Sequence, residues 1–461
     1  MSIDKTSFIS ATSTKIGTAN SSCTTSDLVA LSAATNALTT NRHNYIDKAC
    51  DLPDIALGTV PEGTIIYAND IKAQLVATST SWIGLDGRTY RKDVDTGPLY
   101  SAGRYNYGAL LRYPLNATEQ CCFNVNCYGG NWIDATSAGS TSLSSAFGIK
   151  VDGTMYQWGY VCFTLNTNIC NTVGVCCISS PVQELCSATN WCQVSSGERR
   201  GSAVKSDGTL WNWGCGNLGN GFIGTCARSP VQEFFSDTTW TCVASSSFDA
   251  IALKSDGSLW TYGSGVSGVY GQVCSPVQEC LSATWIAISN RSGGTAENGA
   301  HAIKSDGTLW GWGRNCCGQL GYNSGSATFI SYSPVQEASS STTWCGVGAG
   351  NYSSAGIKTD GTLWGWGTRP PNSVWTVGAH SSPVQEICSA TNWCHVTHGT
   401  SGIGIKADGT MWGWGQNYCY SLGLGTTSGL NTCSPVQEGN GFTDWWRVCQ
   451  YGSVSYAIRN C

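Results

Sequence analysis

The sequence is dominated by a decapeptide, KSDGTLWGWG at residues 304–313, whose close copies recur along most of the chain. The aspartate of this motif returns at intervals of 48 to 55 residues. A period near 50 residues is typical of propellers and solenoids, in which each unit buries its apolar face against the next. The six copies of the aspartate are Asp152, Asp207, Asp256, Asp306, Asp360 and Asp408.

Two further signals recur with the decapeptide. A tryptophan begins a short apolar run before each copy, and the string SPVQE follows each copy. Each unit therefore carries about four short segments of strand character, which is the content of one propeller blade. The leading tryptophans are Trp132, Trp191, Trp240, Trp285, Trp344 and Trp393.

The decapeptide itself predicts a hairpin and a strand. Side chains alternate along a strand, so Trp310 and Trp312 share one face while Leu309 and the glycines share the other. Glycine weakens a strand unless something packs close to it, and we expect a ring of the neighbouring unit to cover it. The aspartate of the Asp-Gly turn is expected to cap that turn. The repeat rings that carry this structure are Trp158, Trp213, Trp312, Trp366 and Trp414.

The two ends of the chain together supply one more unit. Residues 446–448 and 456–459 repeat the first two segments, and the chain stops where the next Asp-Gly is due. The segment GPLYSAGR at 97–104 matches GTLWGWGR, and YPL at 113–115 is a degenerate SPV. An all-β, seven-bladed β-propeller over residues 97–461 is predicted, with one blade shared between N- and C-terminal strands. Deleting the last ten residues is then expected to be unusually damaging.

Three segments precede this propeller: an extension at 1–23, a helical segment at 24–51 and a small β adapter at 52–96. Leu28, Leu31, Ala34 and Leu38 draw one apolar stripe on a helix over 24–41. Such a short helix needs a partner, either the flank of the propeller or sister helices and an anchoring protein. The adapter is predicted to contain strands at 64–67, 74–77 and 82–88.

Charge and hydropathy exclude several classes of partner. The net charge is −5, and no run of Lys or Arg exceeds two residues, which argues against nucleic-acid binding. No stretch approaches the roughly 20 apolar residues of a membrane span, and the first residues lack the pattern of a signal peptide. Charged residues make up only 11% of the chain, so Ser, Thr, Asn and Gly supply the polarity of the surface, as in proteins that persist outside cells.

Cysteine is unusually frequent, with 25 residues. That content suggests disulfides formed in an oxidising setting, although buried thiols are an alternative. No Cys-x-x-Cys pair occurs, which disfavours a zinc site. The string CSATNWC occurs twice, and its ends are the candidate disulfides Cys186 with Cys192 and Cys388 with Cys394.

A search for catalytic residues finds none. The five histidines form no recognisable ligand set, and the carboxylates recur in every unit, whereas active sites are not repeated sixfold. The SPVQE glutamates are expected to meet the motif lysines on the rim. We therefore predict neither an enzyme nor a cofactor. Binding is expected at the loops that differ between units, namely 160–179, 214–228, 290–299, 314–332, 368–380 and 416–432.

The run AIKSDGTLWGWGRNCCGQLGYN at 302–323, with PVQ downstream, resembles the regulator-of-chromosome-condensation repeat of a seven-bladed propeller family. The GQLG element is clear at 318–321, partial at 217–219 and 422–423, and interrupted by RPP at 369–371. The family includes an exchange factor for a small GTPase and bacterial inhibitors of β-lactamase, so the fold selects no activity. The segments EGTIIYANDIK and SWIGLDGRTYR resemble modules that precede such propellers in structural proteins of tailed marine bacteriophages.

These observations predict a bacteriophage virion protein: an appendage, fibre or capsid-decoration subunit, extracellular after lysis. Residues 1–60 would bind other virion proteins, and the propeller loops would bind a host surface protein or glycan. A short apolar helix beside a bulky head suits a homo-oligomer. The alternatives are a soluble protein-binding or inhibitory propeller and, third, a nucleotide-exchange factor for a GTPase.

Overall fold

The structure is a computed structural model that describes residues 45–46, 65–68, 73–77, 82–84, 89–90, 98–104, 119–125, 132–139, 144–161, 176–197, 200–264, 272–279, 283–290, 299–323, 330–368, 371, 380–399, 401–425, 431–452 and 454–459.

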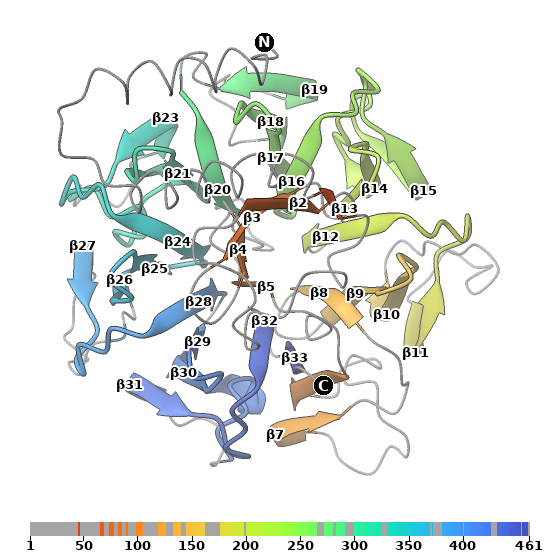
Figure 1. The fold of residues 1–461 in the computed structure, drawn as a ribbon. Helices are drawn as coiled ribbons and strands as arrows, with labels where there is room; N and C mark the ends of the chain where they lie inside the picture. The colour runs from red at the N-terminus through yellow and green to blue at the C-terminus, as the bar shows by residue number, and fades with distance from the viewer. Residues whose placement is uncertain are drawn as a thin grey trace, which may run out of the picture.

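Seven four-stranded antiparallel sheets stand around a central axis, which confirms the predicted seven-bladed β-propeller (Figure 1). Within a blade, consecutive strands are neighbours, and the first strand lies innermost. From the inner to the outer strand, blade 1 contains β8 Trp132–Gly139, β9 Ser144–Lys150, β10 Met155–Val161 and β11 Cys176–Gln183, and blade 2 contains β12 Trp191–Gly197, β13 Arg200–Lys205, β14 Leu210–Gly216 and β15 Thr225–Gln232. Blade 3 contains β16 Trp240–Ser245, β17 Asp249–Lys254, β18 Leu259–Ser264 and β19 Gln272–Glu279, and blade 4 contains β20 Trp285–Asn290, β21 Gly299–Lys304, β22 Leu309–Arg314 and β23 Ile330–Gln336. Blade 5 contains β24 Trp344–Ala349, β25 Ser353–Lys358, β26 Leu363–Gly367 and β27 His380–Gln385, and blade 6 contains β28 Trp393–His398, β29 Ser401–Lys406, β30 Met411–Gln416 and β31 Asn431–Gln437. A short 3₁₀ turn, η4 Tyr418–Tyr420, follows β30.

Blade 7 is assembled from both ends of the chain, as predicted. Its order is β32 Trp445–Tyr451, β33 Val454–Arg459, β6 Leu99–Arg104 and β7 Glu119–Val125. Strand β33 pairs antiparallel with β6, with Ile458 opposite Leu99. The expected outer strand at 113–115 is wrong: Tyr100 pairs with Val125 as Trp310 pairs with Gln336 in blade 4, so β7 is the equivalent of the SPVQ strand.

Arg459 holds the seam of blade 7 together. Its Nε and one terminal nitrogen contact the Asp444 carboxylate at 2.6 and 2.8 Å, and its other nitrogen donates to the Tyr100 hydroxyl at 3.0 Å. Its guanidinium also lies 3.6 Å from the centre of the Phe442 ring. This arginine occupies the place of the motif lysine, and it ties the end of β33 to both β6 and the turn before β32.

The core between blades is made of repeated rings. In β22, Trp310 and Trp312 share one face, as predicted, and pack in a cluster with Trp285 of their own blade and Leu259 of blade 3. The alternation of the strand therefore directs both rings toward the preceding blade. The predicted repeat rings that are at most 1% exposed are Trp158, Trp213, Trp312, Trp366 and Trp414.

The covering of the strand glycines differs from the prediction. Gly311 of β22 is covered by its own blade: the His301 ring of β21 lies 3.2 Å from the position of a Cβ on Gly311, and the carbonyl oxygen of the fully buried Leu320 lies 3.3 Å from it. A neighbouring ring does reach a glycine, but that glycine is in the loop: Trp366 of blade 5 lies against Gly321 and donates to the Gln319 carbonyl at 2.7 Å. The GQLG element therefore links two blades. It fills the space beside Gly311 of β22, and it contacts the Trp366 ring of the next blade.

The motif aspartates cap their hairpin turns, as predicted. Asp306 Oδ1 accepts from the Thr308 amide at 2.9 Å and from the Thr308 hydroxyl at 2.6 Å. The backbone contact to the residue two positions on recurs at Asp152, Asp207, Asp256, Asp360 and Asp408.

The predicted glutamate–lysine pairs on the rim are wrong. The buried Glu337 carboxylate accepts from the backbone amides of Ser339 and Ser341 at 2.7 and 3.0 Å. Lys304 instead places its ammonium 3.7 Å from the centre of the Trp310 ring. A carboxylate only 1% exposed needs several donors close by, and the turn after SPVQE supplies them locally. The same amide contacts occur at Glu184, Glu233, Glu386 and Glu438.

A separate five-stranded sheet lies ahead of the propeller strands in the sequence. Three of its strands match the predicted adapter strands, and two more flank them. Its order is β1 Tyr45–Ile46, β2 Ile65–Ala68, β3 Ala73–Ala77, β4 Trp82–Gly84 and β5 Thr89–Tyr90. The predicted extension at 1–23 and the predicted helix over 24–41 fall outside the described residues.

Candidate binding surface

Four large apolar side chains are exposed together on blade 2, and we call them the aromatic patch. They are Phe222, Ile223, Phe234 and Phe235, with exposed fractions of 66, 65, 59 and 51%. Phe222 and Ile223 lie in the loop between β14 and β15, and Phe234 and Phe235 lie in the turn after β15. The two phenylalanines of the turn contact each other edge to face, with ring centres 5.3 Å apart.

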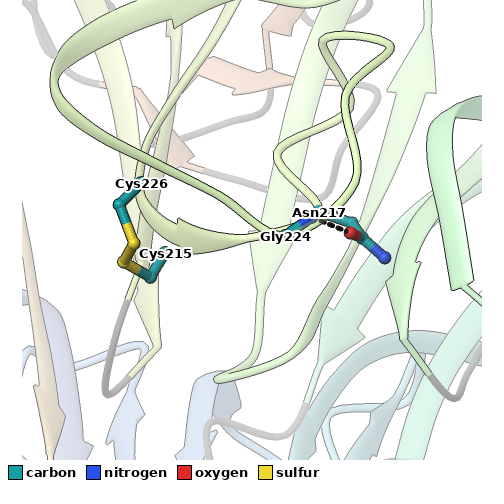
Figure 2. Close-up of a disulfide and its surroundings, with 4 residues drawn as sticks. All are labelled: Cys215, Asn217, Gly224 and Cys226. Atoms are coloured by element: carbon teal, nitrogen blue, oxygen red, sulfur yellow. Dashed lines mark hydrogen bonds between the residues drawn. A yellow bond between two sulfur atoms is a disulfide. The ribbon is translucent and has the colours of Figure 1, made fainter.

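The loop that carries Phe222 and Ile223 is closed at its base by a disulfide. Cys215 of β14 and Cys226 of β15 are directly opposite each other in the antiparallel pair, and their sulfurs are bonded (Figure 2). Within the loop, the Gly224 amide donates to Asn217 Oδ1 at 2.9 Å. Both contacts shorten the free length of the loop, so its tip is presented on a constrained base.

The same loop is fastened to its surroundings on both sides. The Gly221 amide donates to the Cys274 carbonyl of blade 3 at 2.8 Å, and the Phe234 amide donates to the Gly219 carbonyl at 2.9 Å. A Cβ on Gly221 would lie 2.5 Å from the ring of Phe234, so only glycine allows this ring to close over the loop. Loop and turn therefore form one rigid body.

The base of the loop contains the partial GQLG element of blade 2, NLG at 217–219, which packs against blade 3. Gly219 receives the ring of Tyr262 from blade 3, as Gly321 receives Trp366. The buried Arg200 donates to the Asn217 carbonyl at 3.3 Å, and its guanidinium lies 5.2 Å from the centre of the Tyr262 ring. Burial lowers the pKa of Arg200 and raises the pKa of Tyr262.

The aromatic patch suits contact with an apolar protein surface. Residues 214–226 contain no Asp, Glu, Lys or Arg, so the loop carries no charge to direct an ionic partner. Contiguous exposed apolar groups mark interaction sites in soluble proteins, and aromatic residues are enriched where interfaces are energetically strongest. The loop 214–228 was among the predicted binding loops. The turn was missed, although FF follows SPVQE here, whereas LC, CL, AS, IC and GN follow it at 185–186, 280–281, 338–339, 387–388 and 439–440.

The candidate disulfides are wrong. Among the described cysteines, Cys186 is not bonded to Cys192, and Cys388 is not bonded to Cys394. Cys186 lies in the turn after β11, whereas the Cys192 thiol on β12 donates to the Val204 carbonyl of β13 at 3.2 Å. The second copy of the string has the same arrangement, with the Cys394 thiol 3.4 Å from the Ile405 carbonyl.

The remaining predicted site residues belong to the architecture. The six aspartates are spread over six hairpins, one in each continuous blade, and the five rings lie between blades. Within the ranges that the structure describes, no three His, Cys, Asp or Glu side chains are grouped so as to hold a metal ion. No helix of the described residues is long and apolar enough to cross a membrane. Of the six predicted loops, only 214–228 is described throughout.

The geometry defines the chain as a seven-bladed propeller with one divided blade, and solved structures of the same fold are known. Prp20p from Saccharomyces cerevisiae, described with its binding to Gsp1p and histones, matches with a TM-score of 0.65 at 16% identity, over 79% of this chain and 92% of that chain. Human WBSCR16 matches with a TM-score of 0.65 at 15% identity, over 79% and 100%. Yeast RCC1 (Prp20) bound to Kap60 matches with a TM-score of 0.64 at 15% identity, over 79% and 89%.

These likenesses establish the propeller fold, which the resemblance of the repeat to the regulator-of-chromosome-condensation family led us to expect. No family model matches the sequence, and no curated protein does so either.

Proposed function

We propose that this chain is a non-enzymatic binding protein of a bacteriophage virion, which displays its propeller to a protein on the host surface. The observation that carries the proposal is the aromatic patch: two exposed apolar side chains on a loop that a disulfide closes and that hydrogen bonds fasten, and two more on the adjoining turn. Preorganised loops lose little conformational entropy on binding. We take the partner to present an apolar, uncharged surface, because the exposed side chains of the aromatic patch are apolar and the loop carries no charge.

Two features support a place on the virion. The disulfide joins an exposed cysteine to a half-exposed one, and such bonds persist in oxidising surroundings. Low charge with a surface rich in Ser, Thr and Asn suits a protein that functions outside the cell. Residues 1–60 would attach the chain to other virion proteins, and a homo-oligomer would display several propellers side by side.

The second candidate is a soluble protein-binding or inhibitory propeller, which the same patch favours. The solved propellers described with Gsp1p, histones and Kap60 make protein binding a natural use of this fold, and exchange-factor activity on a GTPase stands third. Localisation separates the first two candidates: the first requires the chain in purified particles, the second a free protein in the cell.

The test combines mass spectrometry of purified particles, with and without reduction, with competition for adsorption. We expect the chain in the particles, with Cys215 and Cys226 linked before reduction. Added full-length chain should block adsorption of particles to host cells, and the double variant Phe222→Ser with Ile223→Ser should block at least tenfold less well. Val151→Ser, which changes an exposed apolar residue of blade 1, is the matched control and should block like the wild type.

Two results would count against the proposal. Absence of the chain from particles, together with patch-dependent binding to a cellular protein, would select the soluble alternative. Full competition by the Phe222 and Ile223 double variant would remove the aromatic patch from the host contact.

A further inference from the structure

The innermost strands of all seven blades enclose a second site, distinct from the aromatic patch. A hollow of about 110 Å³ opens at one end of the central channel and receives residues from β8, β12, β16, β20, β24, β28 and β32. An engineered cavity of about 150 Å³ holds one benzene ring. The hollow is smaller, so it can enclose one edge of a small ring molecule while the rest of that molecule stays outside.

Serine hydroxyls in the hollow are arranged as hydrogen-bond donors. Ser195 Oγ accepts the Ser245 amide of the next blade at 2.9 Å, and Ser289 Oγ accepts the Ala349 amide at 2.9 Å. A hydroxyl has one proton and two lone pairs. Because each oxygen already accepts from a backbone amide, its orientation is fixed while its proton remains to be donated. All four of these residues line the hollow.

An amide of blade 4 adds an acceptor. Asn290 Nδ2 donates to the Ala244 carbonyl at 3.3 Å and to Asp249 Oδ1 at 2.9 Å. These two contacts orient the amide, and its Oδ1 is buried without a hydrogen-bond partner in the part of the chain that the structure describes. Buried polar atoms are normally satisfied, so we take this oxygen as the candidate acceptor for a donor that enters the hollow.

The hollow carries no permanently charged side chain; its titratable groups are His398 and Cys449. None of its lining residues is Asp, Glu, Lys or Arg. On the same inner strands, Arg447 of blade 7 and Asp134 of blade 1 form an ion pair at 2.7 Å, so their charges offset each other. Hydroxyl donors beside a fixed acceptor suit a ligand whose hydroxyl groups each donate and accept hydrogen bonds. They do not suit an anion or a cation.

We propose that the mouth of the channel binds one neutral sugar unit of a carbohydrate, with its hydroxyls meeting the serine and threonine hydroxyls and the Asn290 amide. This site is independent of the proposed protein contact at the aromatic patch, because it rests on different residues at the axis of the ring. Thr397 of β28 is the most informative residue to test. It lines the hollow, and its hydroxyl supports no other part of the protein among the contacts seen.

The experiment is saturation-transfer NMR and calorimetry on the full-length chain with four probes: glucose, galactose, mannose and N-acetylglucosamine. We expect at least one to bind with a millimolar dissociation constant. Thr397→Val, which keeps the shape and removes the hydroxyl, should weaken that binding about fivefold to tenfold, and Thr397→Ser should restore it. Thr342→Val, a change at an exposed position of the rim, is the matched control and should bind like the wild type.

Equal melting temperatures of the Thr397 and Thr342 variants will show that Thr397→Val leaves the fold intact. The double variant at Phe222 and Ile223 should retain sugar binding in full, which separates this site from the aromatic patch. The proposal is overturned if none of the four probes binds at about 50 mM, which would mean that the hollow holds water only. It is equally overturned if Thr397→Val leaves the affinity for the bound sugar unchanged.

Discussion

The repeated charged residues stabilise the blades locally rather than forming a site. In blade 4, the Lys304 ammonium lies 5.2 Å from the centre of Trp285 and 3.7 Å from the centre of Trp310. A cation over aromatic faces is stabilised by the ring quadrupole. Asp306 meanwhile caps the hairpin next to this lysine. Since the lysine is held by rings and the aspartate by its turn, neither needs an ionic partner.

Glu337 is the charged residue whose loss should be felt most. Its carboxylate accepts from two backbone amides and from the indole nitrogen of Trp344 at 3.1 Å. Glu337→Ala leaves these buried donors without an acceptor, and we expect a loss of about 2–4 kcal/mol in stability. Glu337→Gln keeps one acceptor oxygen and should lose about half as much. Thermal unfolding checks both, and equal melting temperatures for the alanine variant and the wild type would contradict the capping role.

The hairpin aspartates should make the fold sensitive to acid. Hydrogen bonds from Thr308, Thr362 and Ser258 lower the pKa of Asp306, Asp360 and Asp256 respectively. A carboxylate whose pKa is lower in the folded state stabilises the fold above its unfolded pKa of about 3.9, and this stabilisation is lost as the pH falls through the folded pKa.

We therefore expect the melting temperature to fall below about pH 4. A triple variant with Asn at these three aspartates keeps the acceptor oxygens but cannot titrate, so its melting temperature should fall less between pH 7 and pH 3. Each site is largely exposed, and solvent screening keeps the effect of one site small. A triple variant with the acid sensitivity of the wild type would show that other groups control the transition.

Residue roles could be predicted from the sequence where they depend on neighbours in the chain. The Asp-Gly pair encodes a turn, and Asp306 caps it as predicted. The backbone amides that bind Glu337 could not be predicted, because their positions depend on how the chain turns after the SPVQ strand. Nor does the composition show that the carboxylate is buried.

The loop of blade 2 shows what strand pairing adds to the pattern. The position of the loop followed from comparing units, but its disulfide did not, because the bond depends on the register that places Cys215 opposite Cys226. The candidate pairs within CSATNWC failed for the same reason. A turn separates Cys186 from Cys192, whose thiol is directed to β13.

Removing this disulfide should loosen the aromatic patch without unfolding the propeller. The bond closes a short loop with a sequence separation of 11, and cross-links of that length contribute about 2–3 kcal/mol by restricting the unfolded chain. In the double variant Cys215→Ser with Cys226→Ser, we expect faster proteolysis within residues 216–225 and weaker competition for adsorption. The circular dichroism spectrum should stay that of the wild type.

Reduction of the wild type should reproduce the proteolysis, and the control Cys186→Ser, at an exposed cysteine of a turn, should change nothing. Resistance of residues 216–225 in the serine double variant would show that the hydrogen bonds to Asn217 and Cys274 suffice to order the loop.

At the scale of the whole molecule, the ring is closed by strands from opposite ends of the chain. Figure 1 shows the last strands, β32 and β33, in the same blade as β7, which comes from the first third of the sequence. Both the number of blades and this division could be predicted, because each unit repeats the same pattern and the missing half was visible at the other end. The outer strand was misplaced because β7 carries no copy of the SPVQ string. The ring of Phe123 in β7 covers Gly423, whereas rings of the third strand, Tyr262 and Trp366, cover Gly219 and Gly321.

The divided blade predicts how the ring responds to moving its ends. In blade 7, β33 ends at Arg459, one residue after Ile458, which pairs with Leu99 at the start of β6. Arg459 and Leu99 therefore stand as Lys304 and Leu309 do, which flank the SDGT turn of blade 4. A circular permutant can therefore join Arg459 to Leu99 through Ser-Asp-Gly-Thr and begin between β7 and β8. Every blade is then built from consecutive strands. No strand from one end of the chain pairs with a strand from the other end.

This permutant lacks residues 1–98 and 460–461, so its reference is the unpermuted chain of residues 99–459. We expect it to fold with the spectrum of that reference but to unfold faster in denaturant, because its first and last blades separate without breaking a β-ladder. Deletion of residues 454–461 instead removes β33 from the middle of a sheet, and strand β6 then has no neighbour on the axial side. That truncation should fail to fold, which stopped-flow unfolding and sedimentation will show. A permutant that unfolds as slowly as the unpermuted chain of residues 99–459 would mean that the apolar contacts between blades, rather than the shared blade, hold the ring closed.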